Sequence, residues 1–212
     1  MDLSQPISTA IPTLDGPVLT VLSRTTQPLT GRKVHQLASG GSESGTRRVL
    51  QRLVSTGLVT ATEVGSAVQY VLNRDHLAAA AVLELTNLRQ KLIQRIHDVI
   101  DTEWSEHPIH ASLFGSAARG DGNLHSDVDL LVVHGSRDLP PEWNDQVGSL
   151  AEQVHSWTGN HLQIYELSSA ALLAHIASGE SIVDDWLRDS VTVFGPDFRQ
   201  LRHRIGRGLM PQ

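Results

Sequence analysis

The sequence predicts an α+β protein in which a small helical domain and a larger mixed-sheet domain are joined by a long helix. Residues 15–74 show three short helical stripes followed by two alternating apolar segments. Residues 75–104 carry apolar side chains at helical spacing without a glycine or proline. Residues 105–212 alternate apolar strands with amphipathic helices, which is typical of a sheet covered by helices. A chain of 212 residues is long enough for two domains that each bury a core.

Charge is divided unevenly along the chain. Residues 1–74 contain seven Lys/Arg and four Asp/Glu, whereas the rest of the chain contains ten Lys/Arg and nineteen Asp/Glu. The N-terminal part is thus mildly basic and the C-terminal part acidic, which indicates different partners for the two parts.

The composition excludes several classes of function. There is no cysteine, which excludes disulfides and thiolate metal sites. No apolar run approaches the roughly 20 residues that a membrane span needs, so we expect a soluble, cytoplasmic protein without a membrane partner. Aromatic residues make up only 4%, which argues against single-stranded nucleic acid as the main ligand, because base stacking needs aromatic side chains.

The N-terminal elements can be taken in order. Residues 1–14 are polar and punctuated by prolines, which predicts a flexible arm. A first helical stripe follows, and a second short helix begins after Thr30, a residue suited to cap it. The third helix, about Glu43 to Thr56, presents an apolar side inward and ends at Gly57. Two alternating segments separated by a Gly-Ser-Ala turn then predict a β-hairpin.

Three helices followed by a hairpin resemble a winged helix-turn-helix domain, and the resemblance covers residues 15–74. Residues 53–59 are similar to the end of the recognition helix running into the wing in bacterial regulators of that type. The resemblance implies binding to duplex DNA, although winged helices also dock proteins or dimerise, and that alternative stays open. The residues it assigns to nucleic acid are Arg47, Arg48 and Ser44 at the major groove or its phosphates, and Arg32 and Lys33 at the backbone.

The segment 75–104 is expected to form one linking helix of about 28 residues, or about 42 Å. Its first part should connect the two domains, and its second part should lie on the C-terminal sheet. Helices between domains often dimerise, while a stripe that faces the core explains the same pattern. A homodimer is therefore one of two arrangements compatible with this segment.

The residues suited to chemistry lie between Leu113 and Val133. Gly115 and Ser116 follow a short apolar strand and begin a helix, where backbone N–H groups and a hydroxyl suit a phosphate. Ten residues later, Asp127 and Asp129 enter an apolar strand, in which residues two apart point the same way. Two adjacent carboxylates repel each other unless a cation such as Mg2+ neutralises them. The pattern fits phosphoryl or nucleotidyl transfer.

Gly-Ser, ten residues and Asp-x-Asp resemble the signature of the DNA polymerase β-like nucleotidyltransferase superfamily. The Ala-Arg-Gly at 118–120 is most similar to its small prokaryotic minimal nucleotidyltransferases, and the match covers residues 105–167 well. The resemblance implies Mg2+-dependent transfer of a nucleoside monophosphate from a nucleoside triphosphate, with ATP favoured, to a hydroxyl acceptor. It assigns the nucleotide to Gly115, Ser116, Arg119 and Ser126, and the metal to Asp127 and Asp129.

Active members of this superfamily usually carry a third acid on the strand that corresponds to residues 161–167. The apolar period of this strand puts Gln163 at that position, and glutamine can neither act as a general base nor neutralise a second ion. Glu166 is the nearest carboxylate and is therefore the candidate for the third catalytic residue. By strand parity, however, it points away from Gln163 unless a bulge intervenes.

Two functions from different classes follow. The first is a nucleotidyltransferase that is targeted or regulated by a DNA-binding winged helix and that acts on a protein, nucleic acid or small molecule. The second is a DNA-binding transcriptional regulator whose degenerate transferase domain only binds nucleotide or dimerises. The minimal nucleotidyltransferase resemblance adds a toxin-antitoxin partner as a further alternative.

The remaining C-terminal residues predict a mixed sheet with helices on one face. The expected elements are a helix over 143–157 ended by Gly159, a strand over 161–167, a helix from Ser168 or Ser169 to about Ala177, a helix over 181–188, a strand over 191–194 and a basic helix over 197–207.

Overall fold

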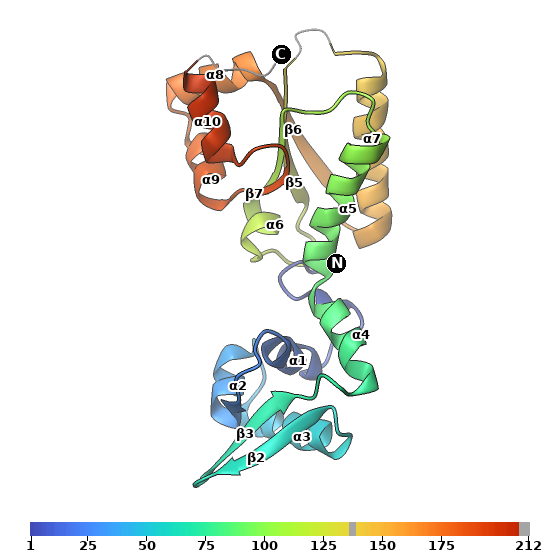
Figure 1. The fold of residues 1–212 in the computed structure, drawn as a ribbon, viewed down its shortest axis with the longest axis vertical. Coiled ribbons are helices and arrows are strands. Elements are labelled where there is room, and N and C mark those ends of the chain that lie inside the picture. Colours follow the sequence, from blue (N-terminus) through green and yellow to red (C-terminus); the bar gives the residue numbers. More distant parts are fainter. Residues whose placement is uncertain (136–138, 208–212) are drawn as a thin grey trace. The chain divides into compact units, whose positions relative to one another are not determined.

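A computed structural model of the protein describes residues 1–135 and 139–207 (Figure 1). The chain divides into two compact units. The N-terminal unit comprises Asp2 and Ser4–Arg89, and the C-terminal unit comprises Met1, Leu3 and the chain from Gln90 onward. Each unit is described by itself. No helix in the described ranges combines the length and the apolar character needed to cross a membrane.

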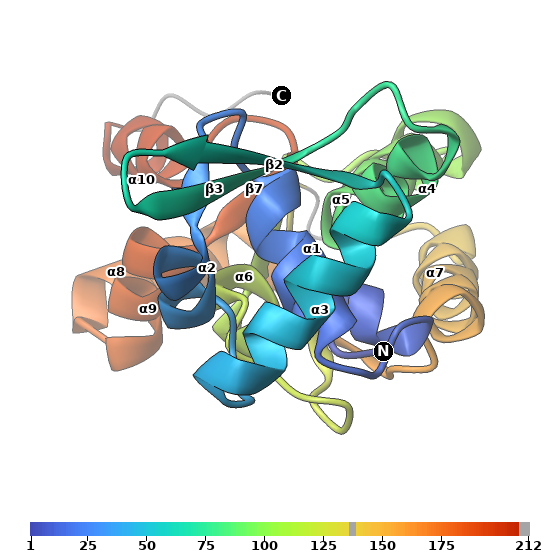
Figure 2. The ribbon, with the colours of Figure 1, turned by 90° about the horizontal axis from the view of Figure 1, so that it is seen from below.

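The N-terminal unit contains the three helices and the hairpin expected from the sequence, together with a short strand that completes a three-stranded sheet. The sheet has the order β1-β3-β2 with antiparallel pairing, and the hairpin packs against α1 and α3 (Figure 2). The elements are η1 (Pro6–Thr9), α1 (Asp15–Ser23), β1 (Leu29–Thr30), α2 (Gly31–Leu37), α3 (Glu43–Ser55), β2 (Val59–Val64), β3 (Ala67–Leu72) and α4 (Leu77–Thr86).

Side-chain caps start three of these helices, namely α2, α3 and α4, where the ring of His76 accepts a hydrogen bond from the backbone N–H of Ala78. The hydroxyl of Thr30 accepts a hydrogen bond from the backbone N–H of Lys33, as expected for the start of α2. The hydroxyl of Ser42 does the same for Gly45 at the start of α3. Each cap satisfies one of the backbone donors that a helix start leaves free.

Two expectations about this half of the chain are corrected. Residues 1–14 do not form a loose arm throughout, because η1 buries Ile7 completely in the core of the N-terminal unit. The predicted single helix over 75–104 is two helices, since α4 ends at Thr86 and α5 (Leu88–Glu103) begins after Asn87. Apolar spacing alone hides this break, because the spacing continues across it while the two helices bury their stripes in separate cores.

The C-terminal unit is built on a four-stranded mixed sheet with the order β6-β5-β4-β7. The central pair β4–β5 and the pair β4–β7 are antiparallel, whereas β5 and β6 are parallel. The elements after α5 are β4 (His110–Phe114), α6 (Gly115–Arg119), β5 (Val128–His134), α7 (Glu142–Thr158), β6 (Leu162–Ser168), α8 (Ser169–Ser178), α9 (Ser181–Asp189), β7 (Val191–Phe194) and α10 (Phe198–Gly206).

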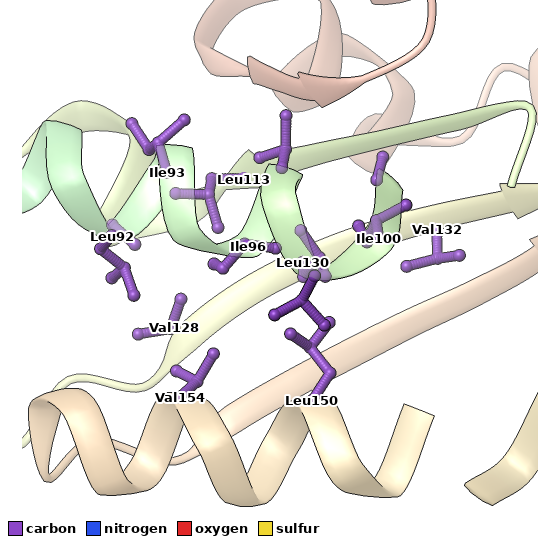
Figure 3. Packing of buried hydrophobic residues seen from close by; sticks show 14 of the residues in the cluster. Leu92, Ile93, Ile96, Ile100, Leu113, Val128, Leu130, Val132, Leu150 and Val154 are labelled. Carbon is purple, nitrogen blue, oxygen red and sulfur yellow. The ribbon is translucent and has the colours of Figure 1, made fainter. Parts of the chain in front are cut away.

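Helices cover both faces of this sheet, which corrects the expectation of one covered face. Alternate residues of β5 point to opposite sides. Leu130 and Val132 pack with residues of α5 and α7, such as Ile96 and Leu150 (Figure 3). On the other face, α8, α9 and α10 pack over the neighbouring residue Leu131, in a cluster that includes Trp186, Phe198 and Leu201. Because both faces are buried, β5 reads as a continuous apolar run after Asp129.

Candidate functional site

The turn between β4 and α6 brings Gly115 against Asp129. Gly115 has a φ of +63°, a conformation that glycine adopts readily and other residues rarely do. A Cβ atom added there would overlap the Oδ2 atom of Asp129. The pairing of β4 with β5 sets Phe114 opposite Asp129 and thereby fixes this approach. The first half of the Gly-Ser…Asp-x-Asp pattern is therefore in direct contact with the second half.

The surroundings of Asp129 disfavour the ionised form of its carboxyl group. Partial burial raises the pKa of Asp129 above its ordinary value, the negative charge of Asp127 raises it further, and the guanidinium of Arg119 opposes both effects. A half-buried carboxylate beside a second one suits a hard cation, which would relieve both costs. The charge and partial burial of this carboxylate pair therefore fit Mg2+.

The loop between α6 and β5 holds the two predicted serines close together. A Cβ on Gly122 would lie 3.2 Å from the Oγ atoms of both Ser116 and Ser126. The Oγ of Ser126 accepts a hydrogen bond from the backbone N–H of Asn123 at 2.9 Å. The backbone carbonyl of Ser126 accepts a second one, also at 2.9 Å, from the buried side chain of Asn160. The sequence analysis missed Asn160, and the residue immediately before Asp127 is held through it.

Arg119 is held by two acids at the edge of this loop. Its Nε donates to Asp121 at 2.8 Å, and its Nη1 donates to Asp189 at 3.4 Å. Asp189 ends α9 and also binds Arg188. Sequence reasoning could not find Asp189, because it lies 70 positions along the chain from Arg119 and the tertiary fold alone brings the two together.

Gln163 and Glu166 lie on opposite faces of the sheet. The parallel register of β5 and β6 pairs Gln163 with Asp129, and the register continues without a break to Ser168. Glu166 is paired with Val132 and therefore points to the other face. There its Oε1 lies 3.6 Å from Nε2 of His134. No bulge turns Glu166 toward Asp127 and Asp129, so its candidacy as the third catalytic carboxylate is corrected.

Within the described parts of the chain, no group of three or more His, Asp or Glu side chains is arranged to hold a metal ion. The carboxylate pair is therefore without a third acid, and a neutral amide stands at the paired position. The arrangement can bind one hard cation and the phosphates of a nucleotide, while the second ion of a two-metal site would lack a protein ligand beside Asp129.

In the N-terminal unit the predicted nucleic-acid residues lie on α2 and α3. Arg32 and Lys33 occupy the first turn of α2, and Arg47 and Arg48 are exposed on α3. A hollow of about 430 Å³ is lined by Arg32, Arg47 and one carboxylate, Glu43, and by residues of the hairpin β2–β3. The other predicted residues, Lys33, Ser44 and Arg48, are not among the residues that line this hollow. Its two arginines give a surface on α2 and α3 that can contact phosphates.

Residues 93–159 match the family model of the nucleotidyltransferase domain. This range runs from α5 to the end of α7 and contains Gly115, Ser116, Asp127 and Asp129, so the predicted resemblance is confirmed over it. The match ends before β6, the strand that carries Gln163. No curated protein matches the chain.

Solved structures with low overall similarity were also found. A toxin-antitoxin complex with AMP-PNP shares 15% identity at a TM-score of 0.37, covering 55% of this chain and 85% of that chain. The tri-AMPylated Shewanella oneidensis HEPN toxin in complex with MNT antitoxin shares 14% identity at a TM-score of 0.35, covering 57% and 85%. The archaeal chromatin protein TrmBL2, described with a novel mode of DNA binding, shares 14% identity at a TM-score of 0.26, covering 82% and 71%.

Proposed function

We propose that the C-terminal unit is a Mg2+-dependent nucleotidyltransferase that moves a nucleoside monophosphate, AMP in the favoured case, from a nucleoside triphosphate to a hydroxyl acceptor. One observation carries the proposal. The carboxylate of Asp129 packs against Gly115, where a side chain would not fit. A carboxylate pair that can hold a cation is thereby placed beside a helix start that can hold phosphates.

The residues have distinct roles in this proposal. Ser116 and the backbone N–H groups at the start of α6 bind triphosphate oxygens, and Ser126 shapes the loop beside them. Asp127 and Asp129 hold the Mg2+, which when bound neutralises phosphate charge. The acceptor oxygen forms a bond to the α-phosphorus, and the bond to pyrophosphate breaks. With no carboxylate at Gln163, the acceptor proton passes to a phosphate oxygen of the nucleotide.

Gln163 also supports the second candidate function. Its register position beside Asp129 is where a third acid would serve as base and ligand. A chain that has lost this acid could retain nucleotide binding and act as a DNA-binding regulator that senses nucleotide or dimerises. In either case the N-terminal unit acts as a winged helix-turn-helix, with Arg32 and Arg47 beside the hollow and Arg48 on the same helix as Arg47.

One incubation separates the two functions. The full chain is mixed with each α-labelled nucleoside triphosphate and Mg2+, and label is sought on the protein itself, on RNA, on DNA and on co-expressed partner proteins, which also tests a toxin-antitoxin acceptor. Transfer that is lost on Asp127→Asn supports the enzyme. Mg2+-dependent binding of ATP in calorimetry without transfer to any acceptor supports the regulator. Absence of both would overturn the assignment of the site.

The DNA-binding role of the N-terminal unit has its own test. Replacing Arg47 and Arg48 by alanine should weaken binding to duplex DNA. It should also reduce the salt slope, which is the slope of the logarithm of the binding constant against the logarithm of the salt concentration, by about 1.8, because each lost phosphate contact removes roughly 0.9 from it. Replacement of Arg24, an exposed arginine that follows α1, gives the effect of removing one positive charge elsewhere on the unit and serves as the control for each single replacement, Arg47→Ala and Arg48→Ala. A slope that is equal in parent and double variant would show that this unit docks protein instead.

A further inference from the structure

The most basic part of the acidic C-terminal unit is its last helix. Residues 75–197 contain six Lys/Arg and nineteen Asp/Glu, whereas residues 198–212 contain four arginines and no acid. In α10, Phe198, Leu201 and Ile205 are buried, while Arg199 and Arg202 are exposed. The fold thus separates one strongly positive surface from an otherwise negative unit.

This surface is hollowed between α9 and α10. A hollow of about 870 Å³ is lined by four arginines, namely Arg188 of α9 and Arg199, Arg202 and Arg207 of α10 or its end. Asp184 is the only carboxylate among its lining residues in the part of the chain that the structure describes. Arg199 is held in place because Nε and Nη2 donate to the carbonyl of Leu187 at 3.4 and 3.2 Å. Because Arg188 is itself paired with Asp185 and Asp189, the excess positive charge of the hollow comes from Arg199, Arg202 and Arg207, and the guanidinium of Arg199 is fixed.

The hollow is connected to the candidate active site by ion pairs. Arg188, which lines the hollow, binds Asp189, and Asp189 also binds Arg119 of α6. A single carboxylate at the end of α9 thus contacts both the hollow's wall and α6, the helix that begins with Gly115 and Ser116. A polyanion bound in the hollow would lie on the same helix end that positions Arg119.

We infer that the hollow between α9 and α10 binds the phosphodiester backbone of a nucleic acid, and that this nucleic acid supplies the terminal hydroxyl that accepts the nucleotide. The inference rests on the proposed transferase function. Guanidinium groups match phosphate oxygens in geometry and charge. The described lining of the hollow contains no Phe, Tyr or Trp, and its one ring is the imidazole of His203, so the contacts are mainly to the backbone phosphates and largely independent of sequence. An acidic protein fits less well, because the Asp and Glu side chains that it would have to bring into the hollow are depleted at protein interfaces.

The test measures binding apart from transfer. A fluorescein-labelled RNA hairpin and a DNA hairpin of the same sequence are titrated by anisotropy without nucleotide or Mg2+, at several KCl concentrations. All proteins are full chains that also carry Arg47→Ala and Arg48→Ala, which removes the contacts proposed for the N-terminal unit. The test variant is Arg202→Gln with Arg207→Gln. The matched control is Arg24→Gln with Arg204→Gln, which removes the same charge and includes an α10 arginine that does not line the hollow.

The test variant should bind about tenfold more weakly at low salt, with a salt slope lower by about 1.8 for a duplex stem, while the control stays within twofold of its parent. A difference in affinity between the RNA and DNA hairpins identifies which of the two nucleic acids is the acceptor. Equal losses in test and control, or no binding by the parent, would overturn the inference. Displacement by polyglutamate as effective as by unlabelled hairpin would reassign the hollow to an acidic protein. Failure of the proposed function would appear separately, as absent Mg2+-dependent ATP binding by the parent.

Discussion

Replacing Gln163 by aspartate should make the stability of the protein depend more strongly on Mg2+. Gln163 is paired with Asp129 in adjacent parallel strands, whose separation is about 4.8 Å. Two carboxylates about 5 Å apart repel by roughly 0.8 kcal/mol in water and 3 kcal/mol at an effective dielectric constant of 20. Gln163 is exposed and Asp129 is partly buried, so solvent screening favours the lower end, about 1 kcal/mol.

The measurement is the midpoint of thermal unfolding in EDTA and in saturating Mg2+. In EDTA, Gln163→Asp should unfold a few degrees below the parent, since about 1 kcal/mol shifts the midpoint of a domain this size by roughly 2–6 °C. In Mg2+ the third carboxylate becomes a ligand, so the difference should vanish or reverse, and transfer should appear or increase. The control is Gln163→Asn, because asparagine has nearly the same shape as aspartate without its charge. This variant should show neither the lower midpoint in EDTA nor the gain in Mg2+.

A Mg2+ response that is equal in the aspartate and asparagine variants would refute the reasoning. It would mean that the side chain at position 163 does not face the carboxylate pair. The third acid would then have to come from a segment that we have treated as structural, and the register argument for a degenerate site would fail.

Three further predictions concern the same site. Gly115→Ala should cost about 1–2 kcal/mol of unfolding free energy from the positive φ and should also weaken Mg2+-dependent ATP binding, because the new Cβ displaces the Asp129 carboxylate; urea unfolding and calorimetry measure the two effects, and unchanged affinity would contradict the contact. Asp129→Asn should raise the thermal midpoint in EDTA at neutral pH. The pKa of Asp129 is raised in the folded state, so its ionisation destabilises the fold at pH values above that pKa. The stabilisation of Asp129→Asn over the parent should therefore disappear below the ordinary pKa of about 3.8; a higher midpoint of the variant that persists at pH 3 would point to another cause. Glu166→Gln should leave the transfer rate within about twofold, because Glu166 faces His134 on the opposite side of the sheet; a loss of 100-fold, the scale of a missing general base, would restore Glu166 as a catalytic residue.

Sequence reasoning predicted most elements of the C-terminal unit because local signals there agree with the tertiary fold. The helix ended by Gly159 and the strand over 191–194 were placed within a residue or two of α7 and β7. The position of Gln163 followed from the alternation of its strand, since the burial of Leu162 and Ile164 on one face sends Gln163 to the other.

Features that depend on tertiary contacts were not predictable from local pattern. Asn160 and Asp189 lie far along the chain from the groups they bind, Ser126 and Arg119. The continuous apolar run of β5 indicates that both faces are buried, but it does not show whether helices or another sheet cover them, and the second helical layer was missed for that reason. Burial of Ile7 was missed because its neighbours are polar residues and prolines.

The interruption at Asn87 has a thermodynamic consequence. Since α4 buries its apolar side with the N-terminal core and α5 with the C-terminal core, we expect the chain to hold two cooperative folding units. Ligand linkage acts only on the unit that binds. In scanning calorimetry, ATP with Mg2+ should therefore move the heat-absorption peak of the C-terminal unit and leave the peak of the N-terminal unit in place.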